Sequence, residues 1–204
     1  MNLFCEYVFK YQIWYMQELI SQLQIKVNDK LYVKDPSSSE LGQSIIIHAL
    51  ELINKNGLEN FTFGKLAKAL KTTESSIYRY FENKHKLLIY LTSVYWGWLE
   101  YRLVFCTANI ENPEDKLRGA LENLCSPANS ETTVHGLSVR SLQNAATLES
   151  SKVYLTKEAK KEDEDGLFQG YERLCERLGN LISEVNKDYD YPNSLASTLI
   201  ESIH

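Results

Sequence analysis

One stretch, residues 61–81, constrains the fold of this chain more than any other, because it predicts two short helices joined by a tight turn. Thr62 and Thr73 can each accept a hydrogen bond from a free amide in the first turn of a helix, so they mark the two predicted helix starts. Ile77 and Phe81 lie four residues apart in the second helix and face inward. The rest of that helix is a polar surface with one cation. A helix-turn-helix places such a surface in the major groove of DNA.

These residues and the helix before them resemble the DNA-binding domain of TetR-family transcriptional regulators, over roughly residues 41–92. One position departs from the family pattern. Where the family usually has glycine in the turn, this chain has Lys71, which must either adopt a left-handed backbone conformation or use another turn type. The residues that carry the resemblance are Leu66-Ala67, the run from Thr73 to Phe81, Asn83-Lys84, Leu87-Leu88 and, in the preceding helix, Ile45-Ile46, Ala49-Leu50, Ile53 and Gly57.

The resemblance implies an all-α fold in which a three-helix helix-turn-helix domain precedes a helical domain for ligand binding and dimerisation. We expect an arm and linker over residues 1–38, the DNA-binding domain over 39–88 and the regulatory domain over 89–204. The implied function is a sequence-specific transcriptional regulator. It would be a homodimeric repressor that a small-molecule effector releases from a double-stranded DNA operator. The alternative is an all-α ligand-binding or interaction protein without operator-specific DNA binding, and salt-dependent binding to one operator separates the two.

The residues expected to approach DNA lie in and beside the two short helices. Lys84 and the phenol of Tyr80 are expected to touch phosphate, whereas polar residues of the second helix are better placed for base edges. Tyr78 has an alternative role in packing between the helices. The positions that match DNA-contacting positions of the family are Thr73, Tyr78, Arg79, Tyr80 and Lys84. The complete predicted set is Thr62, Lys65, Thr73, Glu74, Ser75, Ser76, Tyr78, Arg79, Tyr80 and Lys84.

The distribution of charge supports contact with DNA at one end of the molecule. The whole chain has a net charge of −5, which alone argues against a nucleic-acid binder. Residues 62–90, however, carry six basic and two acidic side chains, a net charge of +4, and the remainder carries −9. A basic module on an acidic body confines DNA contact to the module.

The sequence gives no sign of catalysis, so we expect no enzyme, no cofactor and no metal site. It contains no Gly-rich phosphate loop, nucleophile elbow or zinc-helix motif. Its four cysteines are scattered without ligand spacing, which favours buried, reduced thiols and a cytoplasmic protein. The longest uncharged stretch near the N-terminus is too short to span a bilayer, so no membrane partner is expected. The cysteines are Cys5, Cys106, Cys125 and Cys175.

The N-terminal segment allows two interpretations. Residues 1–27 could form an amphipathic arm that packs on the body or on a partner subunit, or translation of the natural protein starts at Met16. Residues 25–33 alternate apolar and polar side chains and predict a short extended segment. After a Pro- and Ser-rich linker, a helix is expected from about residue 40 to 55, closed by Gly57.

The regulatory part is predicted to consist of helices throughout. Asn83 can cap a strongly aromatic helix over residues 84–107, which should be buried on most faces. Asn112 and Pro113 predict the next helix start. The acidic run 162–165 predicts a solvated break, and the pattern at the last residues suggests that the natural protein continues. The other helices are expected at 113–125, 132–148, 150–163, 167–185 and from about 193 onward.

Two features of this part have both a structural and a functional interpretation. The aromatic helix either packs the core or lines an effector cavity, for which the candidate residues are Tyr95, Trp98 and Tyr101. The narrow apolar seam from residue 167 to 185 fits either an internal bundle or a homodimer. The resemblance favours the homodimer, since TetR-like regulators pair through their last two helices. The predicted interface is Leu167, Tyr171, Leu174, Leu178, Leu181, Leu195 and Leu199.

Overall fold

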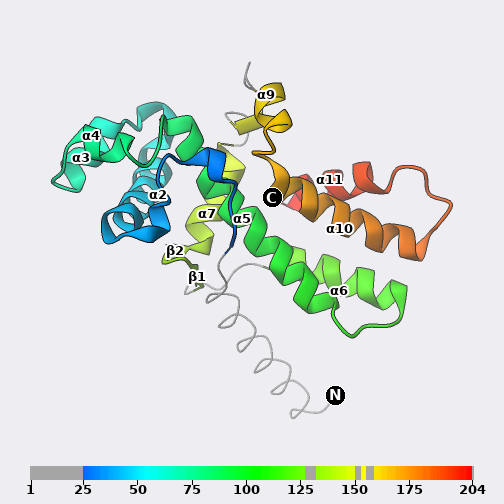
Figure 1. The fold of residues 1–204 in the computed structure, drawn as a ribbon. Helices are drawn as coiled ribbons and strands as arrows, with labels where there is room; N and C mark the ends of the chain where they lie inside the picture. Colours follow the sequence, from blue (N-terminus) through cyan, green and yellow to red (C-terminus); the bar gives the residue numbers. More distant parts are fainter. Residues whose placement is uncertain (1–24, 127–131, 150–152, 155–158, 204) are drawn as a thin grey trace, which may run out of the picture.

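The computed structural model describes residues 25–126, 132–149, 153–154 and 159–203, and it is mostly helical (Figure 1). The predicted arm therefore lies almost entirely outside the described residues. Within the described part, no helix is both long and apolar enough to cross a membrane. The elements are η1 (Asp29–Leu31), η2 (Pro36–Ser38), α2 (Glu40–Asn60), α3 (Phe63–Ala69), α4 (Glu74–Tyr78), α5 (Lys84–Thr107), α6 (Pro113–Cys125), β1 (Thr133–Val134), β2 (Leu137–Ser138), α7 (Val139–Leu148), α9 (Ala159–Glu164), α10 (Gln169–Val185) and α11 (Pro192–Ile203).

Local capping signals set most of the helix starts. The Ser39 hydroxyl accepts from the Gly42 amide at 3.2 Å, and the Asn83 side chain accepts from the Lys86 amide at 2.8 Å. These contacts satisfy amides that the first helical turn leaves free. Gly57, with φ of 73°, interrupts the helical geometry of α2 where the sequence predicts the first helix to end. The predicted helix over residues 84–107 coincides with α5.

Helix α5 is the central element of the fold. It leaves the helix-turn-helix and runs through the regulatory part, with α10 on one side and α6 and α7 on others (Figure 1). Most of its side chains from Leu87 to Leu103 are buried, as its aromatic, apolar sequence predicts. The predicted domain boundary at residue 88 falls inside this helix. Helix α5 therefore runs without a break from the helix-turn-helix into the rest of the helical body.

The last two helices form a pair that packs on α5 and α6. Four residues predicted for a dimer interface lie in this protomer's own core, so their side chains face α5, α6 or α11 and not solvent. The apolar seam of α10 thus packs within the protomer. Three others, Tyr171, Leu195 and Leu199, are only half-buried. The four core residues are Leu167, Leu174, Leu178 and Leu181.

Two local predictions are wrong, and a third is confirmed in part. Residues 29–31 form a 3-10 turn where an extended segment was expected, because the Asn28 side chain caps the Lys30 amide at 2.9 Å. The region predicted as helix 132–148 opens with an antiparallel hairpin, β1–β2, whose turn residues His135 and Gly136 both have positive φ. The acidic run does mark a break, since α9 ends at Glu164 and a turn precedes α10, and Asp163 and Glu164 are exposed. It is not fully solvated, because the half-buried Glu162 pairs with His85 at 2.9 Å.

Candidate functional site

The helix-turn-helix is held by two side-chain caps and an apolar interior. The Thr62 hydroxyl accepts from the Lys65 amide at 3.2 Å, and the Thr73 hydroxyl accepts from the Ser76 amide at 3.3 Å. Both predicted caps are therefore present. Ile77 and Phe81 are fully buried beneath α4, so the opposite side of this short helix faces solvent.

The turn between α3 and α4 uses a left-handed lysine. Lys71 has φ of 54°, which allows its own amide to bond the Lys68 carbonyl at 3.3 Å and the Thr72 amide to bond the Ala67 carbonyl at 2.9 Å. These two bonds form the Schellman motif that often closes a helix, usually with glycine at the left-handed position. Of the two alternatives predicted for Lys71, the chain therefore adopts the left-handed backbone conformation.

Replacing Lys71 with glycine should stabilise the protein by about 1 kcal/mol, because a side chain at positive φ costs about 1–2 kcal/mol and glycine relieves it. Urea unfolding followed by circular dichroism measures the change. Lys68→Gly is the matched control, since it removes the same charge from the exposed side of α3 but should destabilise by about 1 kcal/mol. Equal destabilisation by both substitutions would contradict the assigned turn geometry.

Most of the predicted DNA-contacting side chains are exposed on α3, the turn and α4. Thr62, Lys65, Thr73, Glu74, Ser75, Tyr78 and Arg79 are exposed, and Ser76 is half-buried beside Thr73. Tyr78 is 51% exposed while its ring packs edge-on against Phe63, with centroids 5.0 Å apart. Tyr78 thus supports the helix pair and also presents a face to solvent.

Tyr80 does not occupy the position that the phosphate prediction requires. Its side chain is only 4% exposed, and its phenol shares a hydrogen bond with the Ser39 hydroxyl at 2.8 Å. This bond lowers the pKa of Tyr80 from its ordinary value. The Lys34 ammonium lies 5.3 Å from the ring centroid. Tyr80 therefore joins the helix-turn-helix to the segment that precedes it, and a phosphate contact is not its role in this conformation.

Lys84 is also engaged within the protein. Its ammonium donates to the Leu58 carbonyl at 2.8 Å and the Phe61 carbonyl at 3.3 Å, at the end of α2. The Leu58 amide donates in turn to the buried Glu149 carboxylate at 3.0 Å, at the end of α7. The end of α2 is thereby held by a cation from α5 and an anion from α7. The predicted phosphate contact of Lys84 would require these bonds to break.

Two of the three residues predicted for an effector cavity are packed in the core. Tyr95 and Trp98 are 1% and 2% exposed, and their rings stack with centroids 6.1 Å apart. The Arg102 guanidinium covers Trp98 at 4.7 Å and donates to the Asn123 carbonyl at 2.8 Å. In the described part of the chain, these two side chains are therefore core residues.

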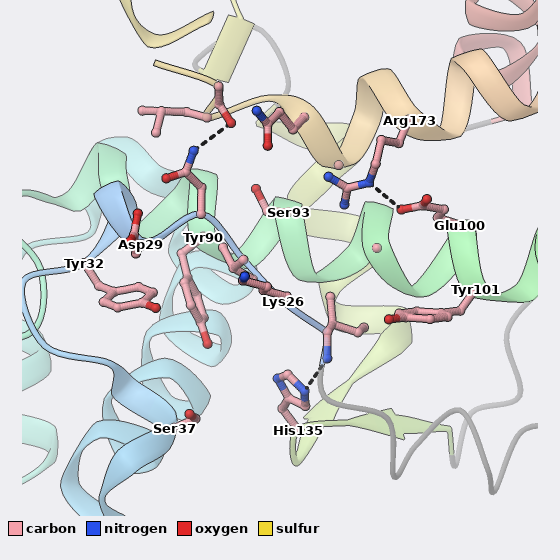
Figure 2. Close-up of a pocket in the computed structure, with 18 of the residues that line it drawn as sticks. Lys26, Asp29, Tyr32, Ser37, Tyr90, Ser93, Glu100, Tyr101, His135 and Arg173 are labelled. Carbon is pink, nitrogen blue, oxygen red and sulfur yellow. Dashed lines mark hydrogen bonds and ion pairs between the residues drawn. The ribbon is translucent and has the colours of Figure 1, made fainter.

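A groove does lie along another side of α5, and Tyr101 lines it (Figure 2). Its volume is about 1090 Å³. Its walls are residues 25–38, which we call the strap, together with α5, the hairpin turn at His135 and α10. We call it the polar groove, because charged and hydroxyl-bearing side chains lie along its length. Its polar lining includes Lys26, Asp29, Asp35, Ser93, Glu100, Arg173 and Arg177.

The strap connects this groove to the helix-turn-helix. At one end the Ile25 amide donates to His135 Nε2 at 3.1 Å, and at the other the Val33 amide donates to the Tyr80 carbonyl at 2.8 Å. Between them, Asn28 donates to the carbonyl of Gly166 at 2.9 Å, beside the start of α10. The strap thus touches both parts of the protein. Sequence reasoning missed it, because each contact joins residues far apart in the chain.

The sequence of the helix-turn-helix and its flanking helices matches a known family. Residues 45–91 match the model described as "Bacterial regulatory proteins, tetR family". The helix-turn-helix domain of this chain is of the TetR family. The chain is a DNA-binding transcriptional regulator by that assignment, which also confirms that it is not an enzyme. The TetR match covers α2 from Ile45 through α4 and the first turns of α5.

The fold resembles solved structures of AibR over most of the chain. The crystal structure of AibR in complex with isovaleryl coenzyme A and operator DNA aligns with a TM-score of 0.57 and 18% identity, covering 79% of this chain and 82% of that one. Apo AibR aligns over the same shares with a TM-score of 0.53 and 16% identity. No curated protein matches the sequence. The mostly helical fold expected of a TetR-like chain is therefore confirmed.

Proposed function

We propose that this TetR-family protein binds a specific double-stranded DNA operator as a homodimer, and that a small molecule in the polar groove releases it. The observation that carries the proposal is the exposed face of α4. Ser75, Tyr78 and Arg79 are exposed there. The Thr73 cap and the buried Ile77 side chain fix the position of α4 itself. Rigid presentation of polar side chains is what base reading in the major groove requires.

Charge supports DNA binding at this end. The region 62–90 has a net charge of +4 and the remainder of the chain −9, so phosphates attract the helix-turn-helix and repel the body. Lys68 and Lys71 are exposed beside α4 and are the better candidates for phosphate contacts. Lys84 and Tyr80 are engaged internally, and the Lys65 ammonium donates to the Asn60 carbonyl at 2.7 Å. A regulator of this kind acts in the cytoplasm, where bacterial operators are found.

The dimer we propose uses α11. Leu195, Leu199 and Ile203 follow one another at four-residue spacing, so they form one stripe, and each remains half-exposed in the protomer. A single short recognition helix reads only a half-site, so pairing through such a stripe supplies both affinity and half-site spacing. The partner we propose for the stripe is a second copy of this chain.

The strap and α5 are the proposed route from ligand to DNA. A ligand in the polar groove would contact strap residues directly, and the strap's Val33 bonds the Tyr80 carbonyl next to α4. A ligand that fits only a displaced strap or a tilted α5 would move the recognition helices relative to their half-sites. Release requires such a difference in affinity between the two conformations. The AibR complex, solved with both an acyl coenzyme A and operator DNA, supports a ligand-responsive function for this fold.

Selection of DNA from the organism's own genome tests the proposal. The purified protein should retain a small set of fragments that share a partly palindromic sequence, with affinity that falls steeply as salt rises. Retention of fragments without a common sequence would favour the alternative, an interaction protein that does not read an operator.

A further inference from the structure

We propose that the polar groove binds an organic oxyanion, a carboxylate or phosphate group on a small molecule, through Arg173 and Arg177 of α10. The inference deepens the proposed function, since it names the chemical class of the effector. It rests on the arrangement of three charged side chains at the α10 end of the groove, where Figure 2 shows Arg173 reaching toward Glu100.

Glu100 holds both arginines in a fixed orientation. Its carboxylate is largely buried, and each of its oxygens is taken by a different arginine. Arg173 Nε donates to Oε2 at 3.0 Å and Arg177 Nε donates to Oε1 at 2.7 Å. The two arginines are one helical turn apart on α10, so their guanidinium groups lie side by side over one carboxylate.

This arrangement leaves donors and positive charge available. Each guanidinium donates to Glu100 through Nε alone. Within the described residues, the terminal nitrogens of Arg173 and Arg177 have no hydrogen-bond acceptor. The side chains are 43% and 50% exposed. Two guanidiniums against the Glu100 carboxylate leave one positive charge, which the exposed Glu172 beside Arg173 offsets in part. Planar guanidinium forks suit the bidentate recognition of carboxylate and phosphate groups.

The rest of the groove favours an oxyanion with an organic body. Tyr101 and Val104 line the wall beside Glu100 and offer apolar surface for such a body. At the end near the helix-turn-helix, Asp29 and Asp35 line the groove and would repel an anion. Burial, and after it the charges of Asp35 and Asp29, raises the pKa of Tyr32 there. The negative group is therefore directed to the arginines. The volume of about 1090 Å³ exceeds what a free inorganic ion needs and fits an extended molecule.

Calorimetric titration of the full chain, without DNA and at constant ionic strength, tests the site with two probes, inorganic pyrophosphate and hexanoate. We expect the wild type to bind at least one probe, and the preferred probe tells whether phosphate or carboxylate is the group recognised. Arg173→Gln and Arg177→Gln should each raise the Kd of that probe roughly tenfold, since each removes charge-assisted hydrogen bonds. Arg118→Gln, on the exposed side of α6, should leave the Kd unchanged.

Failure of the wild type to bind either probe, or equal affinity in all variants, would overturn the inference. If a glutamine variant fails to fold, nitrogen-15 spectra of the wild type decide: the Nε–H signals of Arg173 and Arg177 should shift on addition of the probe, and that of Arg118 should not. Unshifted Arg173 and Arg177 signals overturn the site. Because no DNA is present, these results are independent of operator binding by the wild type, which tests the proposed function separately.

Discussion

A glutamate at position 199 should convert the protein into monomers and reduce its operator affinity by roughly 100-fold or more. Leu199 lies in the middle of the half-exposed α11 stripe, so pairing of two copies would bury the new charge against its symmetric counterpart. Two linked reading heads gain about 10²–10⁴ in affinity over one, and a monomer loses that gain. Sedimentation velocity and DNA-binding titration measure the two effects.

The matched control for this substitution is Thr198→Glu, one residue away on an exposed side of α11. It should remain dimeric and bind the operator as the wild type does. Circular dichroism must show that Leu199→Glu keeps its helices, since Leu199 also contacts the protomer's core. A folded Leu199→Glu protein that still sediments as a dimer would exclude α11 as the pairing surface.

Replacing Lys84 with methionine should destabilise the protein by about 1.5–3 kcal/mol while leaving the salt dependence of operator binding unchanged. The substitution removes the ammonium that donates to the Leu58 and Phe61 carbonyls but keeps an apolar stem of similar shape. Urea unfolding measures the first effect, and operator titrations at several salt concentrations measure the second.

A phosphate contact by Lys84 predicts the opposite pair of results, with stability nearly unchanged and the salt slope reduced by about one. Lys68→Met is the control, because Lys68 is exposed on α3. Its loss should change the free energy of unfolding by about 0.5 kcal/mol or less.

The helix-turn-helix could be predicted from the sequence because the signals that form it are local. Thr62 and Thr73 cap amides three residues away, and the turn at Lys71 closes with bonds that span three and five residues. Such contacts depend on residue type and spacing alone. The same holds for the Asn83 cap and the start of α6 at Pro113.

The roles of Tyr80 and Lys84 could not be predicted, because they depend on partners brought close by the tertiary fold. Ser39 lies 41 residues before Tyr80, and Leu58 lies 26 residues before Lys84. The family pattern identified both positions as close to DNA. It carried no information about the strap or the end of α2, which engage these two side chains.

Of the three residues predicted for an effector cavity, Tyr101 lines the polar groove and the other two do not, for a related reason. Helix α5 is apolar on most faces, so its sequence does not reveal which face packs and which is open. Trp98 faces Arg102 and the α6 side, whereas Tyr101 faces the groove. The pairing of Glu100 with Arg173 and Arg177 spans more than 70 residues and leaves no local pattern.

The α10 seam shows that one apolar pattern is compatible with two kinds of interface, one within the chain and one between two copies. Apolar residues at alternating spacings of three and four predict a buried stripe, and Leu174 and Leu178 are indeed fully buried. Periodicity alone does not say whether the covering surface comes from the same chain or from a second copy. Here the chain's own helices supply it, and the α11 stripe, which stays half-exposed, is the surface that we propose for a second copy.

The most direct test of operator reading by α4 is the base preference of Arg79→Ala, compared with Arg118→Ala, on the DNA sequence recovered from the genome. Each base pair of that sequence is replaced in turn and the affinity measured. Arg79→Ala should relax the preference at particular base pairs by about 1–3 kcal/mol, whereas Arg118→Ala, on α6, should retain the full preference. Unchanged preference in both Arg79→Ala and Ser76→Ala would contradict the assignment of α4 as the element that reads DNA.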